Sequence, residues 1–244
     1  MKKLIFGLAC FTLLNSCSTA QEEGYKIRIE IDGLNNDTVN LANYFGEKLY
    51  YADTAYAQGN IITFEGDSLK GGKYAVVIPG PKYFEFIVAE PYVSIKTNKE
   101  NFLEYMEIID SKENEVFYNY VRFLNLKKKE IKPLEEQLKD FNGNDKERKD
   151  IIAQITQVRK DVEAEQNRIV DDNKDLLVSK YIYMSIPITV PDSPKDENGN
   201  ITDSLFQRRY YVNHFFDHFD FTDDRIVRDQ VFYNKLNEFF TKVV

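Results

Sequence analysis

The sequence of 244 residues contains no tryptophan, two histidines and two cysteines. Cys10 lies inside an apolar run at the N-terminus, and Cys17 follows shortly after that run. If the run is removed as a leader and Cys17 is modified, the mature chain has no free thiol, no disulfide and no CxxC pair. The scarcity of cysteine therefore excludes thiol chemistry by this chain alone. Its stability has to come from a hydrophobic core.

The N-terminus has the parts of a secretory signal peptide, which we expect to span residues 1–16. A short basic start, MKK, precedes the eleven-residue apolar run LIFGLACFTLL. This run is too short to cross a bilayer as a helix, which needs about 20 residues. Ser16 before Cys17, with Leu14 further back, resembles the lipobox of bacterial lipoproteins. The resemblance implies cleavage after Ser16 and a diacylglycerol on Cys17; the alternative is an ordinary secreted protein with a spare cysteine.

Lipidation at Cys17 predicts a membrane-anchored protein of the cell envelope, with residues 17–23 as the tether. The anchor would hold it at the periplasmic face or the cell surface of the outer membrane. Removing Lys2 and Lys3 with the leader leaves 30 basic and 40 acidic residues, a net charge of −10. A surface this acidic disfavours nucleic acid and anionic lipid surfaces. We therefore expect no nucleic-acid partner and attachment to the membrane through the lipid alone.

The dominant hydrophobic period over residues 24–100 is two, which predicts a β-sheet domain. In YKIRIEI, for example, Ile27, Ile29 and Ile31 alternate with polar residues. Further short apolar runs follow, separated by glycine, proline, asparagine and aspartate. Short strands at this spacing favour an antiparallel β-sandwich or a partly open barrel.

Residues 101–244 change to a helical period, which predicts a helical domain and an α+β fold class for the whole chain. Two apolar stripes separated by NGND predict an antiparallel helical hairpin over about 112–180. Asn144 and Glu147 are spaced as a capping pair at the start of the second arm. Pro133 falls within the first arm, and we expect it to kink the helix or to restart it.

The remainder of the helical domain is divided by a loop over residues 186–203 that is rich in proline, aspartate, asparagine and glycine. Two shorter helices are expected after it, over about 204–219 and 223–242. Thr222 is the expected N-terminal cap of the last helix.

The two histidines, His214 and His218, stand four residues apart in NHFFDHFDFTDD and would share one face of a helix. With Asp217 they are the candidate metal ligands, since zinc and iron sites commonly combine imidazole with carboxylate. The sequence offers no third histidine, no cysteine nearby and no HExxH pattern. We therefore favour a structural role and no metal: two histidines at the edge of an aromatic core, tied to an aspartate or a backbone carbonyl.

Other enzyme signatures are missing from the sequence, including GxSxG, GxxxxGK[ST] and a strand followed by GxGxxG. The many carboxylates leave a glycosidase with paired acids open, but the sequence marks no two of them as a pair in a cleft. We therefore predict no catalytic residue, no cofactor and no enzymatic activity for this chain.

Three segments together resemble the N-terminal region of thioredoxin-like lipoproteins from Gram-negative envelopes. ADTAYAQGNIITFEGDSLKGGKYAVVI has the Asp-Thr, Phe-x-Gly and Gly-x-Tyr landmarks of the β-sandwich domain found there. DSKENEVFYNYVRF is similar to the start of the helical segment that follows, a domain of unknown function. The end of that segment is similar to ITDSLFQRRYYVNHFFDHFDFTDDRIVRDQVFYNKLNEFF.

In that family a thioredoxin-like domain usually comes next and carries the cysteine chemistry. The resemblance implies such a domain, or a protein that contains it, as a partner, and it transfers no catalytic residue to this chain. The chain would then be the N-terminal part of a longer thiol-disulfide oxidoreductase, or a shortened member of the family.

Three functional hypotheses follow. The first is a non-catalytic envelope lipoprotein module that positions a redox domain or mediates assembly. The alternative is a free-standing cell-surface lipoprotein that binds a protein or glycan partner, using some of its 18 phenylalanines and 16 tyrosines. The third is a metal-dependent hydrolase centred on His214.

Overall fold

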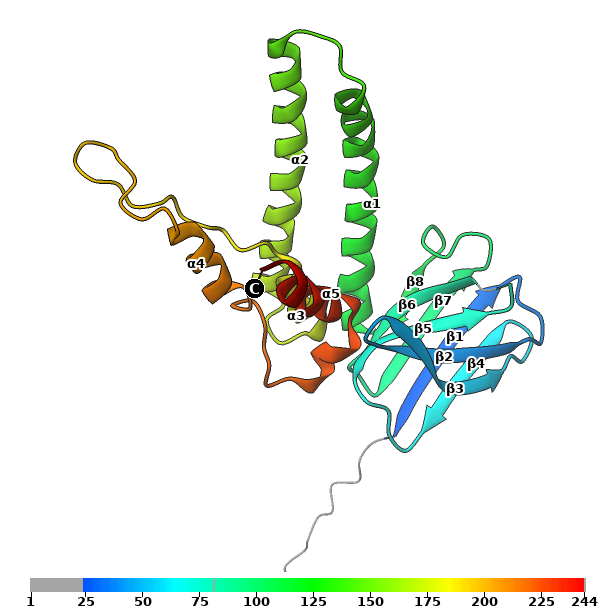
Figure 1. The fold of residues 1–244 in the computed structure, drawn as a ribbon. Helices are drawn as coiled ribbons and strands as arrows, with labels where there is room; N and C mark the ends of the chain where they lie inside the picture. The colour runs from blue at the N-terminus through cyan, green and yellow to red at the C-terminus, as the bar shows by residue number, and fades with distance from the viewer. Residues whose placement is uncertain (1–23, 81, 244) are drawn as a thin grey trace, which may run out of the picture.

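The computed structural model describes residues 24–80 and 82–243. The expected signal peptide, the tether and the lipidated Cys17 lie outside these residues. Figure 1 shows a β-sandwich formed by the N-terminal part of the chain and a long helical hairpin that projects away from it. This order of elements confirms the predicted α+β fold class.

Eight strands form two four-stranded sheets within the described residues, and the predicted β-sandwich is confirmed. One sheet has the strand order β4-β1-β7-β8 and the other β3-β2-β5-β6, and neither sheet closes into a barrel. Neighbouring strands are antiparallel except β1 and β7, which pair in parallel. The strands are β1 (Tyr25–Asp32), β2 (Thr38–Phe45), β3 (Lys48–Tyr56), β4 (Ile61–Gly66), β5 (Gly72–Ile78), β6 (Lys82–Val88), β7 (Tyr92–Asn98) and β8 (Glu107–Asp110).

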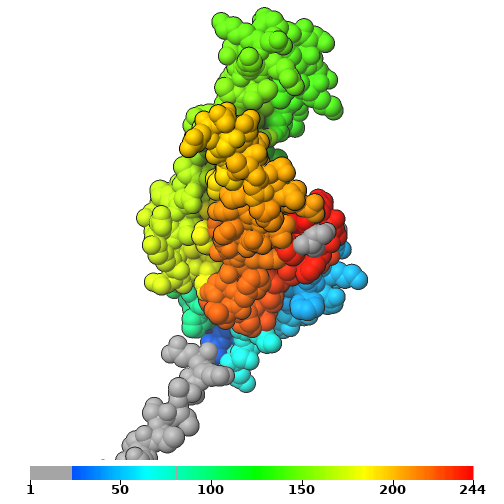
Figure 2. Space-filling model, turned by 60° about the vertical axis from the view of Figure 1, so that its left-hand side comes forward, coloured from blue at the N-terminus to red at the C-terminus, as the bar shows by residue number. Residues whose placement is uncertain are grey.

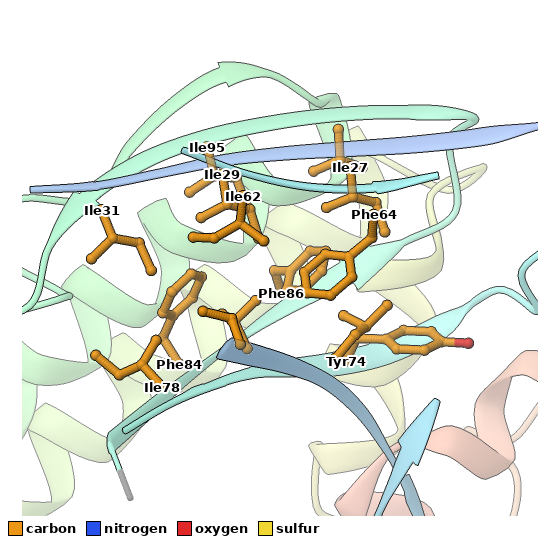
Figure 3. Packing of buried hydrophobic residues seen from close by; sticks show 14 of the residues in the cluster. Ile27, Ile29, Ile31, Ile62, Phe64, Tyr74, Ile78, Phe84, Phe86 and Ile95 are labelled. Carbon is orange, nitrogen blue, oxygen red and sulfur yellow. The ribbon is translucent and has the colours of Figure 1, made fainter. Parts of the chain in front are cut away.

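The core of the sandwich lies between the two sheets. Alternate residues of β1 point into it, and Ile27, Ile29 and Ile31 are almost completely buried there. Figure 3 shows these isoleucines above Phe84 and Phe86, which come from the opposite sheet. The period of two in the sequence therefore corresponds to one buried and one outward face on each sheet.

The helical hairpin consists of α1 (Lys112–Lys139) and α2 (Asp145–Asp172), each of 28 residues. Asn144 and Glu147 form the expected capping box at the start of α2. Of the two outcomes expected at Pro133, the restart is wrong, because α1 continues through this residue, and the kink stays a prediction. A proline removes one backbone donor, and the long helix keeps its hydrogen bonds on either side.

The remaining helices are shorter than predicted. The predicted helix over 204–219 ends at His214, and the one over 223–242 is divided into three pieces. The elements are α3 (Leu177–Ser185), α4 (Phe206–His214), the 3₁₀ helix η1 (Asp224–Arg228), α5 (Gln230–Glu238) and the π-helical turn η2 (Phe239–Val243).

The expected cap at Thr222 is also wrong. The carboxylate of Asp223 caps η1 by accepting a hydrogen bond from the N–H of Arg225. Asp229 caps α5 in the same way through the N–H of Val231. Carboxylates at both positions satisfy the first N–H groups of each helix, so the chain begins a new helix at each aspartate.

α3, η1 and α5 gather at the base of the hairpin. There η1 contacts β2, β5 and α3, and α3 contacts both arms of the hairpin. The tip of the hairpin rises clear of the rest of the molecule in Figure 2. None of the described helices combines the length and the apolar character needed to cross a membrane.

Candidate functional site

The histidine motif spans the end of α4 and the turn that follows it. His214 is the last residue of α4, and its ring stacks on Tyr210 with 4.1 Å between the ring centroids. The Nδ1 atom of His214 lies 2.6 Å from the Oδ2 atom of Asp217. Both side chains are exposed, so this pair lies at the surface.

His218 contacts a different part of the chain. Its Nδ1 lies 3.0 Å from the backbone oxygen of Ile186, to which it donates because a carbonyl oxygen can only accept. The ring stacks on Tyr183 at a centroid distance of 4.2 Å. The two histidines therefore bind different partners and do not share a helix face, because His218 lies beyond the end of α4. Among residues 24–80 and 82–243, no three histidine, cysteine, aspartate or glutamate side chains are grouped so as to hold a metal ion.

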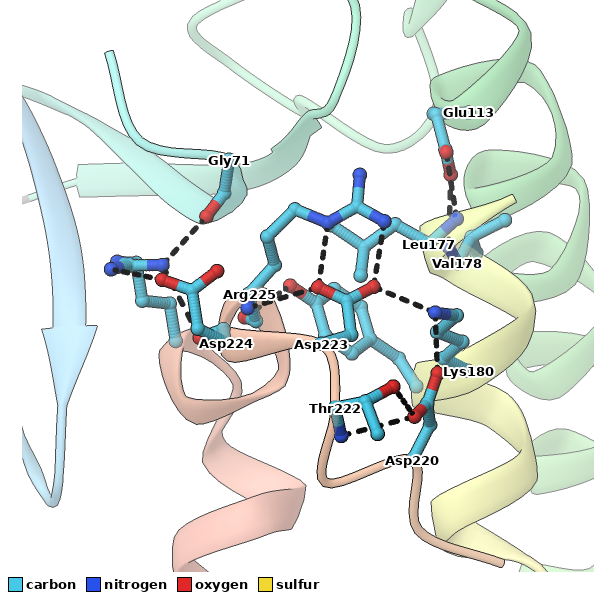
Figure 4. Close-up of polar contacts among 12 residues, drawn as sticks. Gly71, Glu113, Leu177, Val178, Lys180, Asp220, Thr222, Asp223, Asp224 and Arg225 are labelled. Carbon is cyan, nitrogen blue, oxygen red and sulfur yellow. Dashed lines mark hydrogen bonds and ion pairs between the residues drawn. The ribbon is translucent and has the colours of Figure 1, made fainter. Parts of the chain in front are cut away.

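The aspartates that follow the histidines bind basic residues. Asp220 and Asp223 each accept a hydrogen bond of 2.7 Å from the ammonium group of Lys180 on α3 (Figure 4). Asp223 also accepts two bonds, of 2.6 and 2.8 Å, from the guanidinium of Arg225. This cluster attaches the turn before η1 to α3.

These contacts stabilise the charged form of every member of the cluster. The bonds from Arg225 hold the pKa of Asp223 well below its usual range, and Lys180 lowers the pKa of Asp220 to about 2. Burial opposes the charge on Lys180, but the two aspartates outweigh it and its pKa is raised. At neutral pH the cluster is therefore fully ionised.

Glu113, in the first turn of α1, joins the hairpin to α3. Its side chain is buried, and its two oxygens accept hydrogen bonds of 2.7 and 2.8 Å from the N–H groups of Leu177 and Val178 (Figure 4). These N–H groups belong to the first two residues of α3 and have no acceptor within that helix. Burial raises the pKa of Glu113, although the two bonds favour its charged form.

Asn114 covers an open edge of the sandwich. β6 is the last strand of its sheet, and the carboxamide of Asn114 pairs with it as a neighbouring strand would. The side chain accepts from the N–H of Ile87 and donates to its carbonyl, both at 2.7 Å. Tyr118, one turn further along α1, donates to the carbonyl of Glu85 at 2.6 Å. The start of α1 is thus docked on the backbone of β6.

A buried ion pair connects α5 to the outer face of the same sheet. The Nζ of Lys73 on β5 lies 2.9 Å from Asp229 and 3.4 Å from Glu85. Burial opposes the charge on Lys73, but these two carboxylates raise its pKa. Arg228 adds a hydrogen bond of 3.0 Å to the carbonyl of Gly71. We call this set of contacts between the sandwich, α1, α3, η1 and α5 the junction.

A cleft of about 580 Å³ opens beside the junction. It lies between the β4–β5 and β6–β7 loops, and Arg225 forms part of its wall. Asp67 and Glu90 add carboxylates and Ser68 adds a hydroxyl, so the wall carries both signs of charge. The described residues of its wall include no histidine or cysteine that would activate a nucleophile.

Sequence reasoning named Asp217 beside the histidines but missed the junction. Glu113 and Asn114 stand in a first helical turn, where polar side chains usually face water. Lys73 occupies an outward position of β5, diagonally across from Glu85 on β6, and this pairing of opposite charges is the only signal that the sequence carried. A charged pair on the outer face of a sheet gives no indication of which helix will cover it.

A second surface feature is a group of exposed aromatic side chains on the sandwich. β3 forms the edge of its sheet opposite to β6, and β2 is its only partner in the sheets of the described chain. Tyr51 and Tyr56 on β3 are 69% and 65% exposed. The exposed aromatic group consists of Phe45, Tyr50, Tyr51 and Tyr56, all on the neighbouring strands β2 and β3.

Comparison with known families matches residues 25–117 to a domain of unknown function, DUF4369. The matched segment contains the whole sandwich and the first turns of α1, including Glu113 and Asn114. No curated protein and no solved structure matches the chain. The N-terminal part is therefore similar to this domain, and the thioredoxin-like neighbour and the lipoprotein context stay predictions.

Proposed function

We propose that this chain is a non-catalytic lipoprotein module of the cell envelope that positions a thioredoxin-like redox domain or mediates assembly with a partner protein. The observation that carries the proposal is the junction. Its buried polar side chains, Glu113, Asn114 and Asp229, all bind backbone or charged groups of a neighbouring element. Fully bonded buried networks of this kind hold elements in one arrangement, which suits a scaffold.

The hairpin supports the same function because it extends the scaffold away from the sandwich. Each arm of 28 residues is about 42 Å long at 1.5 Å per residue. Most side chains in its outer half are exposed. In this proposal the lipid on Cys17 faces the membrane and the hairpin is available to a partner.

A free-standing binding lipoprotein is the alternative, and the exposed aromatic group on the sandwich favours it. Tyrosine rings stack on sugar rings and on apolar side chains, and their hydroxyl groups form hydrogen bonds. Such a surface would bind a protein or glycan partner, whereas the positioning function does not require it.

Reading the gene beyond codon 244 tests the positioning function. A frame that continues into a thioredoxin-like domain with a CxxC pair supports it. A stop codon at that point contradicts the positioning function. The remaining functions are then assembly with a partner protein and binding by a free-standing lipoprotein. The binding alternative then predicts that Tyr51→Ala/Tyr56→Ala loses partner binding while keeping its stability, because both side chains are exposed.

The lipid anchor has its own test. Growth with a clickable fatty-acid analogue should label the wild-type chain and should not label Cys17→Ser. A wild-type chain that remains unlabelled and is released in soluble form contradicts the lipoprotein assignment.

A further inference from the structure

One side of the helical hairpin carries a groove that is made of two adjoining hollows. Two hollows, of about 420 and 310 Å³, lie along it and share Arg159 in their walls. Their lining residues recur every three or four positions in each arm, so they occupy one face of α1 and one face of α2. On α1 they run from Leu124 to Lys139, which is roughly 22 Å at 1.5 Å per residue.

The floor of the groove is apolar and partly open. On α1 it is formed by Leu124, Ile131 and Leu138, which are seven residues apart and partly exposed. On α2 it is formed by Ile152, Ile155, Val158 and Val162. Apolar residues at heptad spacing are those that pack against a further helix in a coiled coil or helical bundle.

The rim of the groove is basic, although the chain as a whole has a net charge of −8. Four cations and two carboxylates line it: Lys127, Lys128, Lys139, Arg159, Glu135 and Glu163. Lys127 and Arg159 are already paired with acidic neighbours in the hairpin. Lys128 and Lys139 form no ion pair with the residues that the structure describes, so their charges are available to a partner.

We propose that this groove binds an acidic amphipathic α-helix of a partner protein. The inference rests on the proposed function, for which it names the kind of segment that docks. The apolar face of that helix packs on the heptad floor, and its acidic flanks approach Lys128 and Lys139. A second copy of the hairpin would bring like charges together at this rim, so charge complementarity favours an acidic partner over self-association.

The experiment measures the binding of two synthetic helical peptides to the full chain by fluorescence anisotropy. Both peptides have about 21 residues, or three heptads, with leucine and isoleucine at the core positions. One has glutamate at the flanking positions and the other has lysine. We expect the acidic peptide to bind about 10-fold more tightly, the ratio that two exposed ion pairs provide.

Charge reversal in the groove provides the matched test. Lys128→Glu/Lys139→Glu should weaken the binding of the acidic peptide about 10-fold, and this variant should bind the basic peptide more tightly than the acidic one. The control Lys129→Glu/Lys174→Glu makes the same change in net charge at exposed lysines outside the groove. It should leave the affinity within about 2-fold. Equal binding of both peptides by the wild type, or an equal loss in groove and control variants, overturns the proposal.

Light scattering during size-exclusion chromatography tests whether a second copy of the chain occupies the groove instead. A dimer that the acidic peptide does not dissociate would overturn the proposal in favour of a second copy. These outcomes are independent of the proposed function, which is tested by the reading frame and by the label on Cys17. A lipidated chain with a downstream redox domain and no peptide preference would therefore contradict this inference alone.

Discussion

The sandwich and the helical region differ in how their side chains are buried. The main cluster of the sandwich contains 19 buried side chains, nearly all aliphatic or aromatic, and all but Tyr118 of α1 come from the sandwich. The main cluster of the helical region contains nine, and one of these, Ile87, comes from the sandwich itself. Neither α4 nor α5 has a fully buried residue. The helices therefore depend on the junction, while the sandwich has a core of its own.

This difference separates two roles that a scaffold needs. The apolar core gives the sandwich its stability, and burial of that kind does not specify a partner. The junction uses charges and hydrogen bonds with fixed geometry, which determine how the helices sit on the sandwich. Substitutions in the two regions should accordingly have different consequences.

The largest effect is expected in the core of the sandwich. Phe86 is completely buried, and Phe86→Ala should lower the free energy of unfolding by about 3–5 kcal/mol, because it leaves a cavity between the sheets. The matched control, Phe240→Ala, removes the same side chain where it is 69% exposed and should change stability by less than about 0.5 kcal/mol. Denaturant unfolding measures both, and equal losses would contradict the comparison.

The next largest effect is expected at the junction. Lys73→Met leaves the buried carboxylate of Asp229 without its cation and should cost about 3 kcal/mol. The double variant Lys73→Met/Asp229→Asn removes the unpaired charge and should recover part of that loss. A double-mutant cycle by denaturant unfolding measures the coupling, and strictly additive losses would show that the pair does not act together.

Acid should weaken the junction before it affects the core. The folded-state pKa of Asp223 lies below its unfolded value, so the unfolded state binds more protons over the range between them. The stability from this group is present above about pH 4 and is lost as the pH falls through the folded-state pKa. The contribution of Glu113 to the pH dependence of stability has the opposite sign. Burial raises the pKa of Glu113, so its ionised form is the less favourable one in the folded state.

Thermal unfolding between pH 6 and pH 3 measures this dependence. The Tm of the wild type should fall with pH, and Asp223→Asn should fall less, because it lacks the group that titrates. Parallel curves for the two proteins would show that Asp223 does not contribute to the acid dependence.

The smallest effect is expected at the histidine motif. His214→Ala removes an exposed contact with Asp217 and should change stability by less than about 1 kcal/mol. Elemental analysis of protein purified without chelators should find no stoichiometric metal. About one metal ion per chain, lost in His214→Ala, would instead support the hydrolase hypothesis.

The parts of the fold that have a local signal were predicted from the sequence. The short alternating apolar runs predicted the sandwich, and Asn144 with Glu147 predicted the capping box. The hairpin ends at Asp172 and not near residue 180, because a separate helix, α3, begins at Leu177. β8 was missed because its four residues include no buried side chain and show no alternation over a useful length. The helix expected to reach residue 219 ends early, where Phe215, Phe216 and Phe219 pack against one another in a turn.

The junction could not be predicted because its contacts join residues far apart in the sequence. Arg228 and Gly71 are separated by 157 positions, and Glu113 and Val178 by 65. A polar residue in a first helical turn has the same local pattern whether it faces water or caps another helix. The family match ends at residue 117, so it includes one side of these contacts and not the other.

The most direct test of the account is a distance distribution between the sandwich and the hairpin. The chain has only two cysteines, so Cys10 and Cys17 can be replaced by serine and spin labels attached at Glu65→Cys and Ala164→Cys, which are both exposed. Pulsed electron–electron double resonance should give one narrow distribution, and Asn114→Ala/Lys73→Met should broaden it. A broad or divided distribution without those substitutions would contradict the claim that the junction holds the two regions as one body.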